Sequence, residues 1–139
     1  MKIKNCKWIK PQTVEDGKDG NLVIIENMKD IPFNIKRVYS IHSLIDSTAV
    51  RGCHSHRYLE QVMFCLNGSF KLELNDGFNK EFYLMNISCN GIYIGSNVWR
   101  VMTEFKNNCL IMVLASNEYD ESDYIRNYNK FLKSINYDE

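Results

Sequence analysis

The chain has 139 residues, 45% of them hydrophobic, a length at which one domain can bury a core without disulfide or metal staples. Its 17 lysine and arginine residues balance 17 aspartate and glutamate residues, so charge predicts neither nucleic-acid binding nor an acidic partner-binding tail. We expect a single domain over residues 1–139, with a core at about 20–117 and a C-terminal helix at about 119–135.

The cysteines and the N-terminus indicate a reduced compartment. The N-terminal segment MKIKNCKWIKPQ lacks the apolar stretch of a signal peptide, and no run of about 18 apolar residues occurs. We therefore expect a cytoplasmic protein that does not enter a membrane. The cysteines are odd in number and form no CxxC pair, which predicts free thiols at Cys6, Cys53, Cys65, Cys89 and Cys109.

Short β-rich runs separated by turn residues begin at about residue 21, a pattern typical of an all-β sandwich or barrel. Turns are expected at Asn67-Gly68, Asn75-Asp76-Gly77, Asn90-Gly91 and Asn107-Asn108, because these residues adopt positive φ angles readily. Residues 51–56 also have the pattern of an extended strand. The other predicted strands, whose number fits a jelly roll, are 22–26, 36–42, 61–66, 69–74, 81–85, 91–95, 99–105 and 109–115.

The end of the chain changes to a helical pattern. Apolar side chains recur there at intervals of three and four residues, which predicts an amphipathic helix with Ser122 or Asp120 as its N-cap. We expect its apolar face to pack on the outside of the β domain rather than to bind a ligand. That face comprises Tyr124, Ile125, Tyr128, Phe131, Leu132 and Ile135.

The segment RGCHSHRYLEQ, residues 51–61, carries the chemistry. His54 and His56 alternate along a strand and point to one side, and Glu60 follows. Two histidines and a glutamate on a β domain resemble the cupin metal-binding pattern, which adds a later histidine. The downstream segment GIYIGSNVWRVM contains no histidine, and Arg100 stands there. Arginine has no lone pair to give a metal, and His42 lies before the motif. We expect no metal, although an open site of two histidines and a carboxylate is the alternative.

Without a metal, paired imidazoles suit proton transfer, because their ordinary pKa lies near about 6.5. A purely structural role inside the barrel is the other interpretation of His54 and His56. Glu60 could orient one of the histidines or pair with Arg57 at the surface.

Four segments together resemble a known family: RGCHSHRYLEQVMFCLNGSFKLELNDG, IPFNIKRVYSI, GIYIGSNVWRVM and CLIMVLASNEYDESDYIRNYNKF. They are similar to segments of the dTDP-4-oxo-6-deoxyglucose 3,4-ketoisomerases, sugar-nucleotide isomerases of the cupin superfamily. The resemblance extends from about residue 20 to 133. It implies an all-β, cupin-type jelly roll (a double-stranded β-helix) with a C-terminal α-helix.

The resemblance also implies an activity. Such enzymes use no metal or other cofactor, form homodimers that exchange an N-terminal strand, and move the carbonyl of dTDP-4-keto-6-deoxy-D-glucose from C4 to C3 through an enediol. The product is then aminated toward 3-amino-3,6-dideoxy sugars of surface glycans. By the same resemblance, His54 and His56 match the family's catalytic histidines, Arg51 its neighbouring arginine, and Arg37 and Tyr39 a strand facing the same cavity.

Roles follow from that chemistry. We expect His54 to remove the C3 proton, His56 to move protons between the oxygens and C4, and Arg51 or Tyr39 to stabilise the enediolate. The expected substrate-binding residues are Arg37, Arg51 and Arg100 for the phosphates, Tyr93 for the base, and Glu60.

The N-terminal segment GKDGNL departs from the family's D-x-R-G-x-L pattern, with Asp19 in place of the arginine and Lys18 beside it, which leaves the C4 configuration of the product open. Two other functions use the same fold: a non-catalytic cupin that binds nucleotide sugars, and a 3,5-epimerase with one histidine base and a tyrosine acid. The paired histidines favour the ketoisomerase.

Overall fold

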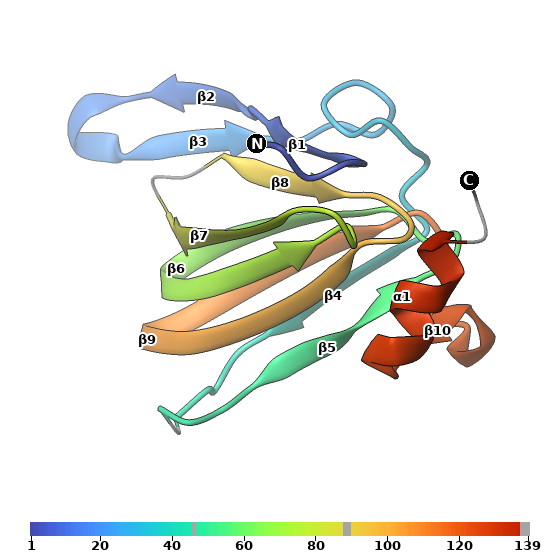
Figure 1. Ribbon diagram of the computed structural model, residues 1–139. Coiled ribbons are helices and arrows are strands. Elements are labelled where there is room, and N and C mark those ends of the chain that lie inside the picture. The colour runs from blue at the N-terminus through green and yellow to red at the C-terminus, as the bar shows by residue number, and fades with distance from the viewer. Residues whose placement is uncertain (46, 88–89, 137–139) are drawn as a thin grey trace.

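The computed structural model describes residues 1–45, 47–87 and 90–136, so Cys89 lies outside the described residues. It consists of a curled antiparallel sheet with one α-helix near the C-terminus, which confirms the predicted fold class (Figure 1). The neighbours in the main sheet follow the order β1-β8-β6-β9-β5-β10, with β4 on β9 and β7 on β6. These strands are β1 (Cys6–Ile9), β4 (Arg37–Ile41), β5 (Arg51–His56), β6 (Gln61–Asn75), β7 (Lys80–Asn86), β8 (Gly91–Ile94), β9 (Trp99–Ala115) and β10 (Tyr124–Ile125).

Two long strands replace four of the predicted ones. The expected turns at Asn67-Gly68 and Asn107-Asn108 were wrong, because β6 and β9 run straight through them. Gly68, Asn107 and Asn108 do have positive φ angles, but the paired strands absorb them as shifts in register between Cys65 and Lys71. Such bulges increase the local twist and curl the sheet toward a barrel. The turn at Asn75-Asp76-Gly77 is confirmed, since it joins β6 to β7.

The core fills the concave side of the curled sheet. Along β6, Phe70, Leu72 and Leu74 are fully buried while Lys71 and Glu73 between them are partly exposed, as expected from the alternation of apolar and charged residues in the segment SFKLEL. A second apolar cluster forms where Ile31 and Phe33 cover Val62, Phe64 and Leu114. The sheet thus has one face turned into the barrel and another packed beneath the segment before β4.

The N-terminal region contains β1 and a strand at Gln12–Glu15, which the sequence pattern did not predict, and a strand at Asn21–Ile24, which corresponds to the predicted strand 22–26. β1 pairs along its whole length with β8, from Cys6 opposite Ile94 to Ile9 opposite Gly91. β2 (Gln12–Glu15) and β3 (Asn21–Ile24) form a separate two-stranded hairpin, closed by a 3-10 turn at Gly17–Asp19. Lys18 and Asp19 are exposed at the tip of this hairpin, which stands away from the main sheet in Figure 1.

The predicted C-terminal helix was too long. The helix α1 spans Tyr128–Asn136, and Asn127 caps it by accepting a hydrogen bond from the Lys130 N–H at 3.0 Å. Asp120 accepts from the Ser122 N–H at 3.0 Å, but this caps the 3-10 turn Glu121–Asp123. Tyr124 and Ile125 form β10 and pair with His56 and Ser55. These residues instead form backbone hydrogen bonds with the edge strand β5, and the spacing of apolar residues along the sequence could not predict this pairing.

The expected packing of the helix on the β domain is confirmed. Phe131 is fully buried, with its ring centroid 5.6 Å from that of Trp99, and it belongs to one cluster with Ile125. No helix in the described part of the chain is long and apolar enough to span a membrane.

Truncating Phe131 tests how far the helix stabilises the domain. We expect Phe131→Ala to lower the free energy of unfolding by about 3–5 kcal/mol, because it removes a buried aromatic ring and leaves a cavity. Lys130→Ala, on the exposed side of the same helix, should change it by less than about 0.5 kcal/mol. Urea denaturation followed by circular dichroism measures both, and equal effects would contradict the packing role of Phe131.

Candidate active site

A bulge in β5 sets the direction of the first histidine. The register of β5 against β9 shifts between Gly52 and His54. Gly52 has φ +85°, and a Cβ there would lie 2.7 Å from the backbone oxygen of Arg100, so the close approach of the two strands requires glycine. Cys53 follows with φ 56°, an uncommon angle for a residue with a side chain. The bulge turns His54 toward the open side of the barrel.

The two imidazoles lie together at the end of the barrel. The ring centroids of His54 and His56 are 4.8 Å apart, with the rings nearly perpendicular. The ring of Tyr124, from β10, contacts both, at 4.9 Å from His54 and 4.3 Å from His56. The strand thus places both histidines on one side, and β10 closes the space beside them.

His54 is held as a neutral base. Its Nδ1 lies 3.0 Å from the carbonyl oxygen of Gly52, which can only accept, so Nδ1 carries the proton and Nε2 keeps the lone pair. Burial of the ring, with the nearby Arg100 charge, lowers the pKa of His54 to about 4. A neutral imidazole is therefore available at physiological pH.

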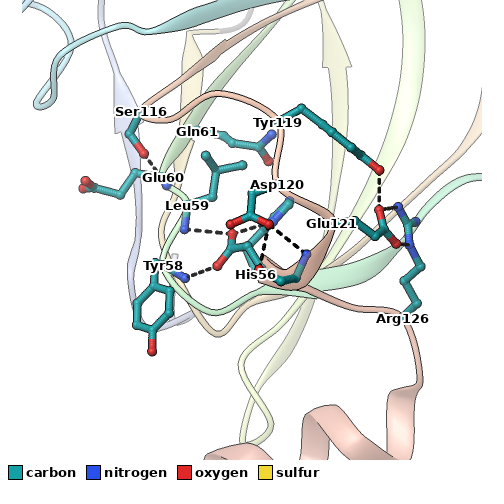
Figure 2. Close-up of polar contacts among 12 residues, drawn as sticks. His56, Tyr58, Leu59, Glu60, Gln61, Ser116, Tyr119, Asp120, Glu121 and Arg126 are labelled. Atoms are coloured by element: carbon teal, nitrogen blue, oxygen red, sulfur yellow. Dashed lines mark hydrogen bonds and ion pairs between the residues drawn. The ribbon is translucent and has the colours of Figure 1, made fainter.

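Asp123 orients the second histidine. Its carboxylate accepts from Nδ1 of His56 at 3.0 Å and from the backbone N–H groups of Tyr58 and Leu59 (Figure 2). The carboxylate alone would favour a charged imidazole, but burial of His56 and the charge of Arg100 outweigh it and lower the pKa of His56 far below its ordinary value. The Nε2 of His56 is buried and has no hydrogen-bond partner among the described residues.

Cationic and phenolic side chains surround His54 in a cavity of about 340 Å³. The guanidinium of Arg37 lies over the rings of Tyr39 and Tyr119, at 5.4 and 5.8 Å from their centroids. The wall formed by β10 ends in Arg126, which is paired with Glu121 (Figure 2). The polar and charged lining consists of Arg37, Tyr39, Arg51, His54, Tyr124 and Arg126. A smaller cavity of about 150 Å³ adjoins on the side of His56 and Asp123.

Arg100 occupies the barrel interior. It pairs with His54 across the strands, is only 1% exposed, and donates through Nη1 to Oε1 of Gln61 at 2.9 Å. Burial lowers its pKa to about 10, so the group remains charged at neutral pH. Arg100 lines neither cavity beside the histidines, unlike Arg37 and Arg51.

Glu60 and Tyr93 lie apart from the histidine pair. The Tyr93 hydroxyl donates to Oε1 of Glu60 at 2.6 Å, and Figure 2 shows Glu60 pointing away from His56. Tyr93 packs at the edge of the second apolar cluster, near Phe33. Glu60 consequently gives no third donor to the two imidazoles. The described residues contain no group of three or more histidine, cysteine or acidic side chains arranged to hold a metal.

Four residues of this site were not predicted as site residues from the sequence: Gln61, Asp123, Tyr124 and Arg126, of which Tyr124 was assigned to the apolar face of the helix. The last three fall in the segment that was assigned to the helix, where helical spacing concealed their return to β5. Gln61 is the first residue of β6 and directly follows Glu60. Its polar side chain in an otherwise apolar strand segment is the one sequence signal that could have indicated a role in the site.

Comparison with known proteins decides the family. The sequence model of the FdtA family, described as WxcM-like, C-terminal, matches residues 4–136 of this chain. The chain belongs to this family. The chain is also 47% identical over 116 residues to the TDP-4-oxo-6-deoxy-alpha-D-glucose-3,4-oxoisomerase of Aneurinibacillus thermoaerophilus, covering 84% of this chain and 83% of that protein.

Solved structures agree in fold. A histidine-to-asparagine mutant of the 3,4-ketoisomerase QdtA from Thermoanaerobacterium thermosaccharolyticum, in complex with TDP-4-keto-6-deoxyglucose, superposes with a TM-score of 0.92. It is 43% identical, with 97% of this chain and 96% of that chain covered. The rmlC epimerase of Mycobacterium tuberculosis, 16% identical, matches in fold with a TM-score of 0.73 over 89% of this chain and 69% of that chain. The cupin-like fold expected from the sequence is thereby confirmed.

The low pKa of His54 predicts a specific pH dependence. In the unfolded chain its imidazole takes up a proton near about pH 6.5, whereas in the folded protein it does so only at about 4. The unfolded state therefore binds more protons between these values, and the free energy of unfolding should fall as pH drops from about 6.5 toward about 4. NMR titration of the His54 Cε1–H signal should give a midpoint below about 5; a midpoint at 6 to 7 would contradict the neutral base.

Proposed function

We propose that this protein is a 3,4-ketoisomerase that converts TDP-4-keto-6-deoxyglucose to its 3-keto isomer. The observation that carries the proposal is a pair of neutral imidazoles 4.8 Å apart beside a cavity lined by arginines and tyrosines. The similarity to a TDP-4-oxo-6-deoxy-alpha-D-glucose-3,4-oxoisomerase and to a 3,4-ketoisomerase in complex with TDP-4-keto-6-deoxyglucose supports the same substrate.

Nε2 of His54 is the base. It removes the proton at C3, which the adjacent C4 carbonyl makes acidic, and the electrons move to the C4 oxygen as an enediolate. Tyr39 donates a hydrogen bond to that oxygen, and the charge of Arg51 lies at the same cavity. His56, with Nδ1 fixed by Asp123, moves a proton between the two oxygens, and return of a proton to C4 leaves the carbonyl at C3.

The nucleotide half of the substrate is anionic. Arg37 and Arg51 line the cavity and can meet its phosphates through paired N–H groups. Arg100 is buried and does not line the cavity, so it acts on the phosphates through its charge rather than through direct contact. The 3-keto product is suited to an aminotransferase, which places the reaction before the formation of 3-amino-3,6-dideoxy sugars for surface glycans.

His54→Asn tests the base. The substitution keeps a polar side chain with a hydrogen-bonding nitrogen, but it removes the basic lone pair of the imidazole. We expect kcat to fall by about 10³-fold, within the range for loss of a general base, while the dissociation constant for TDP changes little. Turnover is measured by NMR, and TDP binding by calorimetry.

The isotope pattern separates the alternatives. In deuterated buffer the wild-type protein should place deuterium at C4 of a 3-keto product, whereas deuterium at C5 would indicate an epimerase. Binding without any exchange would indicate a cupin that only binds nucleotide sugars. Turnover that disappears on treatment with EDTA and returns with one metal ion would contradict the metal-free reaction.

A homodimer is also part of the proposal. Among the described residues the β2–β3 hairpin pairs only with itself, and isolated hairpins are marginally stable in water. Val14 and Leu22 lie opposite each other on it and are 50% and 59% exposed. A second copy that covers this hairpin would bury both, which supports a dimer with an exchanged N-terminal segment even though β1 pairs with β8 of its own chain.

Light scattering tests the dimer. We expect twice the 16.3 kDa chain mass for the wild type and a single chain mass for the variant Val14→Glu/Leu22→Glu, with unchanged circular dichroism. The two introduced carboxylates disfavour burial of the hairpin surface, and both positions lie outside the barrel. Lys18→Ala at the hairpin tip is the control and should remain dimeric; a monomeric wild type at about 50 μM would contradict the proposal.

A further inference from the structure

We infer that Gln61, held by Arg100, is a positioning residue that forces the Tyr39 hydroxyl to donate its proton into the cavity. This inference rests on the proposed ketoisomerase function. It concerns a chain of two hydrogen bonds, from Arg100 to Gln61 and from Gln61 to Tyr39, that joins the barrel interior to the cavity wall.

The first bond fixes the amide of Gln61. A guanidinium has only donors, so the Gln61 atom that faces Nη1 of Arg100 at 2.9 Å must be the carbonyl oxygen Oε1. Gln61 is 2% exposed and Arg100 is 1% exposed, so water does not compete freely for this contact. The amide nitrogen of Gln61 must consequently point the other way.

The second bond fixes the hydroxyl of Tyr39. Nε2 of Gln61 lies 2.9 Å from Oη of Tyr39, and an amide nitrogen can only donate, so the phenolic oxygen accepts. The O–H of Tyr39 is then free to donate elsewhere. Tyr39 lines the same cavity as His54, and burial raises its pKa, so the proton stays on the oxygen. The hydroxyl is thus prepared as a donor before substrate arrives.

The charge of Arg100, which no carboxylate in the described part of the chain neutralises, favours a negative group next to the Tyr39 hydroxyl. Among the described residues Arg100 has no carboxylate in ion-pair contact, and its Nε and Nη2 have no hydrogen-bond partner. A buried charge without a partner is costly. A negative enediolate oxygen beside Tyr39 would compensate it, and the amide of Gln61 polarises the phenol in that direction. Donors arranged in advance for a developing oxyanion act in this way.

Gln61→Glu reverses one link of this chain while preserving size. The new carboxylate would still accept from Arg100, but it would accept from Tyr39 as well and draw the phenolic proton away from the cavity. We expect kcat to fall by about 10²–10³-fold, the loss typical of one oxyanion donor, with KM within about threefold of the wild type. Tyr39→Phe should give a similar loss of kcat. The double variant should be no slower than Tyr39→Phe alone.

Gln61→Met is the matched control. It has similar length but neither donates nor accepts, so Tyr39 keeps its proton without being directed, and the loss of kcat should be smaller than for Gln61→Glu. If Gln61 served only to satisfy Arg100, the loss of kcat would be larger for Gln61→Met than for Gln61→Glu, because methionine leaves Arg100 without a hydrogen-bond acceptor. Melting curves establish that each variant is folded, and the cycle with Tyr39→Phe is measured on Gln61→Met too.

Two results would overturn the inference. One is a kcat for Gln61→Glu within about threefold of the wild type, and the other is a full additional loss when Tyr39→Phe is combined with Gln61→Glu. Both are judged only against a wild type that converts TDP-4-keto-6-deoxyglucose. A wild type without that activity would instead refute the proposed function, so the two failures are distinguishable.

Discussion

The positive charge of Arg100, enclosed in the barrel, is the constraint on which the site depends. It lies opposite His54 in the strand ladder and, after burial, is the next cause that lowers the pKa of both imidazoles, so that both are neutral at physiological pH. The same charge orients the amide of Gln61 and, through it, the hydroxyl of Tyr39. One buried cation thus adds to the effect of burial that keeps both imidazoles neutral, and it also sets the direction of the Tyr39 hydroxyl.

The free-energy cost of burying polar atoms without hydrogen-bond partners falls mainly on residues around the histidine pair. The buried side-chain nitrogen and oxygen atoms that lack a hydrogen-bond partner, within the part of the chain described, belong to Arg37, Ser55, His56 and Arg100. All are at or beside the histidine pair. Native proteins pair nearly all such atoms, so these exceptions mark the surroundings of the histidine pair as the costliest part of the described structure. The uncommon φ of Cys53 lies in the same bulge.

The alternation of side chains along a strand separates two surfaces at the start of β6. Gln61 reaches into the barrel toward Arg100, whereas Glu60 immediately before it turns outward to Tyr93. Asp123 and Tyr124 then arrive from the far end of the chain to complete the inner side. The site therefore depends on the pairing of β5 with both β9 and β10, and the bulge at Gly52 permits that pairing.

The sequence by itself determined the β class, the alternation that buries Phe70, Leu72 and Leu74, and the side shared by His54 and His56, because these follow from a period of two residues. Only the tertiary structure decided that Tyr124 and Ile125 join a strand, that Arg100 is buried, and that Gln61 connects it to Tyr39. Those outcomes depend on contacts between residues 22 to 70 positions apart, and local spacing contains no information about such partners.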